Sequence, residues 1–286
     1  MGRVEGKVAF VTGAARGQGR SHAVRLAEEG ADIIAVDLCQ DIETVGYKLA
    51  GPDDLKETAR LVEAAGRRVV AVQADVRDAG RLADAVERGV RELGRLDVVV
   101  AQAGIAPLHG NPPLQAWTDV INVNLVGTIN AIQVALPHLG EGASIIATGS
   151  AAALMNMGMV QNPGSNPGGS GYAFTKRALS EYAHELGRNL APLKIRINVI
   201  HPTNCNTPML QSAPMYRSFR PDLENPTRED AEPAFAVQQA FPISYVEPGD
   251  ISDTVLFLAS DESKYVTGMQ MRVDAGGYLK WHEYHV

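Results

Sequence analysis

A glycine-rich turn near the N-terminus constrains the fold more than any other feature of the chain. Residues 12–19 read Thr-Gly-Ala-Ala-Arg-Gly-Gln-Gly, follow the apolar run 8–11 and lead into a helical pattern that ends at Gly30. Glycines permit a sharp turn and let the backbone approach a phosphate, and the helix N-terminus attracts negative charge. An ordinary tight turn is the alternative, but the strand, turn and helix together predict a cradle for a dinucleotide pyrophosphate.

An acidic residue at the end of the next apolar run indicates which dinucleotide binds. Asp37 follows residues 33–36, and a carboxylate at this position can accept hydrogen bonds from the adenosine ribose. The same charge repels the 2′-phosphate of NADP, so we expect NAD. Arg16 in the glycine-rich turn argues in the other direction, because a cation there could meet that phosphate. An NADP-linked ketone reductase therefore stays as an alternative.

Apolar runs and amphipathic stretches alternate along the whole chain. The apolar runs are residues 7–12, 31–36, 68–74, 96–101, 143–148, 195–200 and 269–273. The amphipathic stretches are residues 17–29, 53–65, 79–93, 114–138, 172–191 and 248–259. Buried strands separated by helices are typical of a parallel sheet that is covered on both faces. We predict an α/β, doubly wound Rossmann fold that forms one domain over residues 1–286.

Three long connections interrupt this alternation. They are residues 38–52, the Pro/Gly-rich residues 154–171, and residues 208–247, which hold six prolines and little periodicity. All three follow the carboxyl ends of predicted strands, where open α/β sheets bind their ligands. We expect binding loops there, with a substrate lid at 208–247; variable surface loops are the alternative.

Composition argues against several other classes of protein. The net charge is −7 and no run of Lys or Arg points to nucleic acid. No apolar stretch approaches 18 residues, so we expect no membrane span. The N-terminus is polar, so we expect no signal peptide. Cys39 and Cys205 lack metal-ligand spacing and predict inert thiols in a cytoplasmic protein without a metal site.

Four polar residues carry the expected chemistry. Tyr172 and Lys176 are four residues apart at the start of a predicted helix, so the ammonium would lie beside the phenol and lower its pKa. Ser150 follows the run 143–148, where its hydroxyl could bond a carbonyl or alkoxide oxygen. Asn124 lies inside a helical stretch, where an amide is unusual unless it is bonded.

These motifs, in this order and approximate spacing, resemble the short-chain dehydrogenase/reductase family over nearly the whole chain. The resemblance implies a seven-stranded parallel sheet and a homotetramer. It implies that Tyr172 is the general acid/base, that Ser150 orients the substrate oxygen and that Lys176 binds the nicotinamide ribose. It also implies that Asn124 holds a water in a proton relay.

The same resemblance implies a set of NAD contacts. Asp75 and Val76 look like the adenine-contacting pair, and Thr207 looks like the contact to the nicotinamide carboxamide. The full set of expected cofactor contacts is Gly13, Arg16, Gly17, Gln18, Gly19, Asp37, Leu38, Asp75, Val76, Ala103, Gly104, Tyr172, Lys176, Pro202, Thr203, Asn204, Thr207 and Met209.

Three stretches resemble one branch of the family, called mycofactocin-coupled or carveol-dehydrogenase-like. They are residues 6–23, the insertion that follows 37–39, and the His-Pro-Thr run 201–203. This resemblance implies oxidation of a secondary alcohol such as the terpenol carveol to its ketone. It also implies that the insertion covers the NAD, so that a mycofactocin-like external redox cofactor removes the reducing equivalents.

The chain also departs from the family pattern. Gln102 stands where the family has asparagine, which puts its usual tie to the sheet in doubt. Tyr172 follows Ser150 by 22 residues, a longer interval than is usual. These departures leave a non-enzymatic NAD-binding sensor or scaffold as the rival from another class. His201 is expected as a histidine satisfied at a strand end, and titration beside the nicotinamide is the alternative.

Overall fold

A seven-stranded parallel sheet forms the centre of the molecule. The computed structural model describes residues 2–108, 113–154 and 166–281. The strands are β1 (Val8–Thr12), β2 (Asp32–Asp37), β3 (Val69–Gln73), β4 (Leu96–Ala101), β5 (Leu139–Thr148), β6 (Arg196–Pro202) and β7 (Gln270–Val273). Their order is β3-β2-β1-β4-β5-β6-β7, and every pair is parallel. Each predicted apolar run forms a strand, so the predicted Rossmann-like fold is confirmed.

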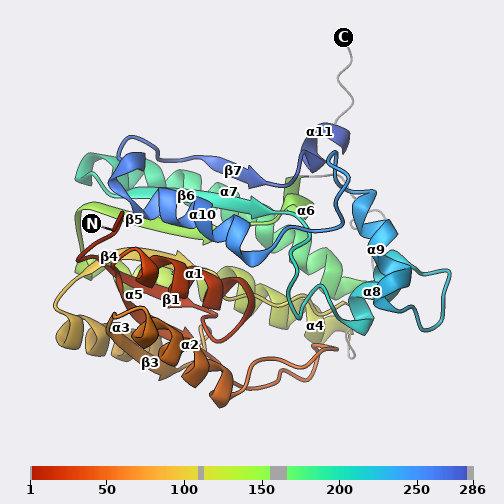
Figure 1. The fold of residues 1–286 in the computed structure, drawn as a ribbon, viewed down its shortest axis with the longest axis horizontal. Helices are drawn as coiled ribbons and strands as arrows, with labels where there is room; N and C mark the ends of the chain where they lie inside the picture. The colour runs from red at the N-terminus through yellow and green to blue at the C-terminus, as the bar shows by residue number, and fades with distance from the viewer. Residues whose placement is uncertain (1, 109–112, 155–165, 282–286) are drawn as a thin grey trace, which may run out of the picture.

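Helices cover both faces of the sheet because successive strand residues point to opposite sides. Phe10 belongs to one buried core and its neighbours Ala9 and Val11 to the other. The principal helices are α1 (Gly17–Glu28), α2 (Pro52–Ala64), α3 (Ala79–Leu93), α5 (Gly127–Ala135), α7 (Pro167–Leu190) and α10 (Pro248–Ala259). Helix α1 packs against α10 and α2, while α3 packs against α5 on the other core (Figure 1).

The sheet reverses its winding between β1 and β4, and this point positions the site. Ligands bind in open α/β folds where the strand order reverses. Thr12 at the end of β1 accepts hydrogen bonds through Oγ1 from the backbone nitrogens of Gln102 and Ala103, each at 3.1 Å. The first turn after β1 is therefore joined to the turn after β4. Figure 1 shows the strand ends pointing toward the side that carries α8 and α9.

Helix α7 starts earlier than the sequence predicts. It begins at Pro167, where the Asn166 side chain accepts a hydrogen bond from the Gly169 backbone nitrogen at 3.1 Å. Tyr172 is therefore inside the helix and does not open it. A cap and a proline at the first helical turn outweigh the glycines that suggested a loop. The short helix α6 (Ala151–Leu154) follows Ser150, and residues 155–165 of the predicted connection lie outside the described residues.

The segment 208–247 contains two short helices, α8 (Ala213–Phe219) and α9 (Arg228–Ala236). The aromatic rings of Phe219 on α8 and Phe235 on α9 pack edge to face, with their centroids 4.7 Å apart. The sequence showed no clear period here because each helix has too few turns to repeat one. Together α8 and α9 form a small hydrophobic cluster of their own beside the sheet (Figure 1).

The helical stretch after β4 corrects an expectation about apolar segments. Helix α4 (Pro113–Val120), a π-helical turn at Ile121–Val126 and α5 form one continuous stretch. Within it, Leu114–His138 is long and apolar enough to cross a membrane by length and composition alone. In the fold, however, its residues Val120, Ile132 and Ala135 are buried, and α4 packs against α7. The apolar character of this stretch serves the protein core.

Candidate active site

Two adjoining cavities lie at the carboxyl ends of the strands. The first, called here the cofactor cavity, has a volume of about 160 Å³, and the second, the substrate cavity, about 170 Å³. Both are lined by Gln18, Gln102, Gly104, Thr207 and Met209. The two cavities therefore meet at these five residues.

The cofactor cavity collects most of the predicted NAD contacts. It is lined by Gly13, Arg16, Gly17, Gln18, Gly19, Asp37, Leu38, Asp75, Val76, Ala103, Gly104, Thr207 and Met209. The remaining expected contacts line the substrate cavity: Tyr172, Lys176, Pro202, Thr203 and Asn204. An elongated ligand that spans both cavities would reach all of them.

The glycine-rich turn fits a dinucleotide because its backbone leaves no room for side chains. Gly13 has φ +68°, and a Cβ there would lie 2.8 Å from the Ala103 Cα. A Cβ on Gly19 would lie 2.0 Å from the Gly13 carbonyl oxygen, so α1 packs directly on the turn. Among the described residues, the buried Gln18 Oε1 makes no hydrogen bond, although Gln18 lines both cavities. A free polar atom there suits a polar ligand.

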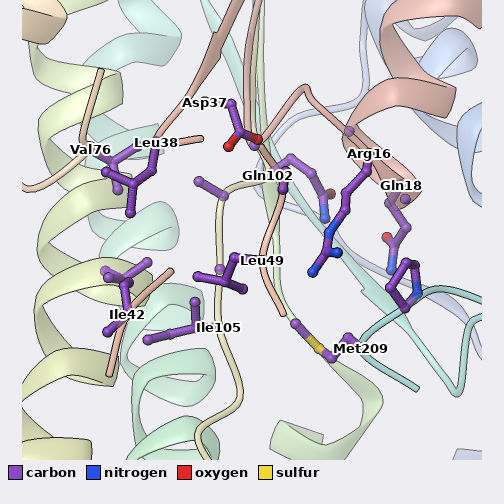
Figure 2. Close-up of a pocket in the computed structure, with 18 of the residues that line it drawn as sticks. Arg16, Gln18, Asp37, Leu38, Ile42, Leu49, Val76, Gln102, Ile105 and Met209 are labelled. Atoms are coloured by element: carbon purple, nitrogen blue, oxygen red, sulfur yellow. The ribbon is translucent and has the colours of Figure 1, made fainter. Parts of the chain in front are cut away.

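Asp37 is fixed at one end of the cofactor cavity. Its Oδ2 accepts a hydrogen bond from the Ala15 backbone nitrogen at 3.0 Å, and its Oδ1 accepts one from the Cys39 nitrogen at 3.0 Å. Figure 2 shows its carboxylate beside Leu38 and Val76 at one end of the cavity. Both bonds hold the negative charge beside the glycine-rich turn, where the sequence placed it.

The insertion at 38–52 forms a wall of the cofactor cavity. Its lining residues are Leu38, Gln40, Ile42, Tyr47, Leu49 and Ala50. Arg16 Nη2 donates a hydrogen bond to the Lys48 carbonyl at 2.5 Å, which joins the insertion to the glycine-rich turn. Figure 2 shows Ile42 and Leu49 facing the space that Arg16 and Gln18 border from the other side. Because the Arg16 guanidinium is hydrogen-bonded to the insertion, it is less available to bind a 2′-phosphate.

Two further bonds anchor the insertion to the body of the protein. Thr44 Oγ1 donates to the buried Asp119 Oδ2 at 2.6 Å, and the Tyr47 hydroxyl accepts from the Ala106 nitrogen at 3.2 Å. Both partners lie beyond β4 in the chain. The sequence showed an insertion at this position but not which of its residues turn inward, because the segment has no regular period.

Ser150, Tyr172 and Lys176 share the substrate cavity, as the motif order predicted. The surplus residues between Ser150 and Tyr172 therefore leave the two in register. Lys176 Nζ lies 5.7 Å from the centre of the Tyr172 ring and donates a hydrogen bond to the Thr148 carbonyl at 2.7 Å. The end of β5 thereby fixes the ammonium beside the phenol.

The pKa of Tyr172 differs from the expectation. Desolvation raises the pKa of its phenol, and a hydrogen bond with Ser150 opposes this only in part. Desolvation also lowers the pKa of Lys176, to about 8. The ammonium beside the phenol was expected to lower the pKa of Tyr172, but burial favours the neutral form of both groups and outweighs it.

Asn124 is held by the π-helical turn, not by regular α-helix. Its Nδ2 donates to the Ile105 carbonyl at 2.9 Å, and its Oδ1 accepts from the Ile105 nitrogen at 2.8 Å. The amide therefore clamps the segment after β4, which lines the cofactor cavity. π-Helical turns inside α-helices often occur at functional sites, because they redirect one residue. This clamp explains why an amide is stable inside the stretch.

The Gln102 side chain is hydrogen-bonded to the sheet, although its greater length had put this bond in doubt. Its Oε1 accepts a hydrogen bond from Thr148 Oγ1 at 2.5 Å and lies 3.2 Å from His22 Nε2. The other ring nitrogen of His22 lies 2.8 Å from Ser252 Oγ. Burial lowers the pKa of His22 to about 4, so the ring is neutral. His22 was missed because nothing local in α1 indicates a partner 80 residues away.

Comparison with known proteins agrees with this geometry. Residues 13–278 match the family described as enoyl-(acyl carrier protein) reductase. The chain is 47% identical to the (-)-trans-carveol dehydrogenase of Rhodococcus erythropolis, over 98% of this chain and 100% of that protein. It is 48% identical to a short-chain type dehydrogenase/reductase of Mycolicibacterium smegmatis, over 98% and 99% of the two chains.

A solved structure shows the same likeness in three dimensions. The crystal structure of carveol dehydrogenase from Mycobacterium avium in complex with NAD superposes with a TM-score of 0.90 and 44% identity, over 98% of this chain and 100% of that one. The match therefore extends over nearly the whole chain. The chain therefore belongs to the short-chain dehydrogenase/reductase family and resembles its carveol-dehydrogenase-like branch.

Proposed function

We propose that the protein is an NAD-dependent oxidoreductase that interconverts a secondary alcohol and its ketone. One observation carries the proposal: Ser150, Tyr172 and Lys176 line a cavity that opens into the dinucleotide cradle. The Mycobacterium avium relative, whose crystal structure contains NAD, supports the choice of cofactor. Asp37 supports NAD over NADP because its carboxylate is bonded to the glycine-rich turn, where its charge would oppose a 2′-phosphate on the adenosine ribose.

The chain's own residues handle the proton and the substrate oxygen. The Ser150 hydroxyl hydrogen-bonds the alcohol oxygen, and the Tyr172 oxygen takes its proton during oxidation. The Lys176 ammonium stabilises the negative charge that the Tyr172 phenolate carries before it takes this proton. When bound, the nicotinamide accepts the hydride from the carbinol carbon, and this chemistry belongs to the cofactor. In ketone reduction, Tyr172 returns the proton.

The walls of the substrate cavity favour an apolar alcohol. Away from Ser150 and Tyr172 they include Leu108, Leu210 and Met215, together with Phe219. Apolar walls with a few convergent polar groups bind compact hydrophobic molecules. A terpenol-like alcohol such as carveol fits this description, and the (-)-trans-carveol dehydrogenase relative supports it. Residues of 208–247 supply much of this wall and act as the substrate lid.

The anchored insertion supports slow exchange of the NAD. The insertion at 38–52 lines the cavity and is bonded through Arg16, Thr44 and Tyr47. Release of the cofactor requires this wall to open. An external redox cofactor of the mycofactocin type, reaching the reduced nicotinamide in place, would then complete the cycle.

Exposed apolar side chains support assembly into a homotetramer. On one side, Leu114 of α4 is 76% exposed and Phe174 of α7 is 50% exposed. On another, Tyr265 is 90% exposed and Met269, next to the edge strand β7, is 50% exposed. Two separate apolar surfaces are what a tetramer with two kinds of contact requires.

The buried thiols of Cys39 and Cys205 suit the reducing cytoplasm.

The test is turnover of secondary alcohols, carveol included, by the purified protein with NAD and an artificial electron acceptor. Tyr172→Phe should lower kcat by about a thousandfold, since it removes the acid/base while leaving the ring. NAD affinity, measured by calorimetric titration, should stay within about twofold. Tyr182→Phe is the matched control, because Tyr182 lies on the same helix and, among the residues that the structure describes, its hydroxyl bonds only the surface residue Gln133.

Retained turnover in Tyr172→Phe would reject the mechanism. NAD binding without turnover of any secondary alcohol by the unaltered protein would favour the sensor. The two departures that gave the sensor weight now have structural explanations, since Gln102 is bonded to Thr148 and Ser150 shares a cavity with Tyr172.

A further inference from the structure

The His201 side chain is hydrogen-bonded to the backbone of Ser150. It lies near the end of β6 and is fully buried. Its Nδ1 lies 3.1 Å from the Ser150 backbone nitrogen and 3.1 Å from the Ser150 carbonyl oxygen. Its Nε2 lies 2.6 Å from Gln270 Oε1 on β7. Both ring nitrogens are therefore bonded, which confirms the satisfied strand-end histidine, but one partner is a residue of the site.

The hydrogen bonds around Gln270 indicate which nitrogen carries the proton. Gln270 Nε2 donates toward the Ser180 carbonyl at 3.5 Å, so its Oε1 faces the ring. An amide oxygen can only accept, so the proton of the neutral ring lies on Nε2. The lone pair on Nδ1 is then free to accept the Ser150 N–H. A protonated ring would instead donate from Nδ1 to the Ser150 carbonyl.

The surrounding backbone is shaped for this ring. A Cβ on Gly149 would lie 2.5 Å from both Cε1 and Nδ1 of His201, so only glycine admits the ring against the segment before Ser150. The Gly149 nitrogen also donates to the Ile200 carbonyl at 2.7 Å. The turn that presents Ser150 is thus pinned to β6 by one backbone bond and one side chain.

Charges near the ring favour its neutral form. Lys176 faces it from α7 and Arg272 from β7, and both positive charges act with burial to lower the pKa of His201. The polar groups that touch the ring, Ser150 and Gln270, carry no charge. The acceptor at Nδ1 is therefore kept at neutral pH.

We propose that His201 is a positioning residue for Ser150: its Nδ1 holds the Ser150 N–H, so that the hydroxyl is aimed at the reacting oxygen in the substrate cavity. This rests on the proposed function, in which Ser150 bonds that oxygen. A histidine that only fills the core would affect stability and leave the orientation of Ser150 unchanged.

Two substitutions separate the two ring nitrogens. In His201→Asn the amide oxygen can occupy the place of Nδ1 and keep the bond to Ser150. In His201→Gln the longer amide reaches toward Gln270 and gives up that bond. We expect kcat to fall by about tenfold or more in His201→Gln and by no more than about threefold in His201→Asn. Equal losses of kcat that follow the losses in Tm would overturn the proposal.

A Ser150→Ala background tests whether His201 acts through the hydroxyl. Without that hydroxyl, His201→Gln should cause no further loss of kcat, whereas a purely structural role gives additive losses. Additive losses would reject the proposal. Absence of turnover in the unaltered protein would instead reject the proposed function, so the two failures are distinguishable.

Gln270→Glu keeps the test informative if the His201 variants fail to fold. The change is isosteric, and a carboxylate beside Nε2 favours the protonated ring, whose Nδ1 cannot accept the Ser150 N–H. We expect kcat to fall several-fold near pH 6 and to recover as the pH rises and the ring loses its proton. A pH profile identical to that of the unaltered protein would contradict the role of Nδ1.

Discussion

Lys176 lies one helical turn after Tyr172, with its Nζ 5.7 Å from the centre of the Tyr172 ring. Lys176 is buried and Tyr172 is partly buried. Desolvation raises the pKa of the phenol and lowers the pKa of the ammonium to about 8. Burial of the Lys176 ammonium therefore destabilises the folded state, and this effect can be measured through the pH dependence of stability.

The pH dependence of stability should report the buried Lys176. Its pKa is about 8 in the folded chain, against 10.5 for an ordinary exposed lysine. Between these values the unfolded state binds more protons, so the free energy of unfolding rises with pH. We expect Lys176 to add about 2 kcal/mol to the free energy of unfolding between pH 8 and pH 10, measured by urea denaturation of nucleotide-free protein as the difference from Lys176→Met. Lys176→Met should remove this rise; an unchanged slope would show that the ammonium is solvated.

Acid should destabilise the protein through His22. Its pKa is about 4 in the fold, against 6.5 for the free side chain, because the ring is buried. The unfolded chain takes up this proton as the pH falls from 6.5 toward 4 and the folded chain does not, so stability is lost over that window. His22→Asn should lower stability at pH 7 but flatten the loss down to pH 5, measured by urea denaturation. The exposed His184 is the control position, and a slope in His22→Asn as steep as that of the unaltered protein would contradict the assignment, since the buried His201 contributes to both slopes.

Asp37 should control the choice between the two dinucleotides. Asp37→Ala removes the charge that opposes a 2′-phosphate, together with the hydrogen bond from the Ala15 backbone nitrogen. We expect NADP affinity to rise and NAD affinity to fall, each by about tenfold, in calorimetric titration. Asp53→Ala, at an exposed carboxylate on α2, is the control. If NADP already binds the unaltered protein better than NAD does, the NADP-linked alternative is correct.

The Thr44–Asp119 bond should slow the release of NAD. Thr44 does not line the cofactor cavity, but its hydroxyl donates to the buried Asp119 at 2.6 Å and anchors the insertion. Thr44→Val keeps the shape and removes the bond, which contributes about 1.5–3 kcal/mol when one partner is charged. We expect release of NADH, followed by stopped-flow fluorescence, to be about tenfold faster or more.

Thr118→Val is the control for that experiment. Thr118 lies on α4, and within the described parts of the chain its hydroxyl bonds only the Leu114 carbonyl at 3.1 Å, one turn earlier in its own helix. Equal release rates in the unaltered protein, Thr44→Val and the control would show that the insertion does not retain the cofactor.

Local patterns predicted the elements of the fold and the identity of the central residues. The strands were recognisable because a parallel sheet buries both faces, which leaves near-continuous apolar runs such as those of β1 and β2. The glycine-rich turn was recognisable because its conformation needs glycine at Gly13. Helix boundaries were less well predicted, as the early start of α7 at Pro167 shows.

The residue types along the chain determined the winding of the sheet, the place of the dinucleotide cradle and the candidates Ser150, Tyr172 and Lys176, because each follows from periodicity or a short motif. Only the tertiary structure decided the partners and protonation of those groups. Gln102 meets His22, His201 meets Ser150 and the insertion meets Asp119 across long stretches of sequence. Hydrogen bonding and desolvation depend on distances in space, which spacing along the chain does not contain.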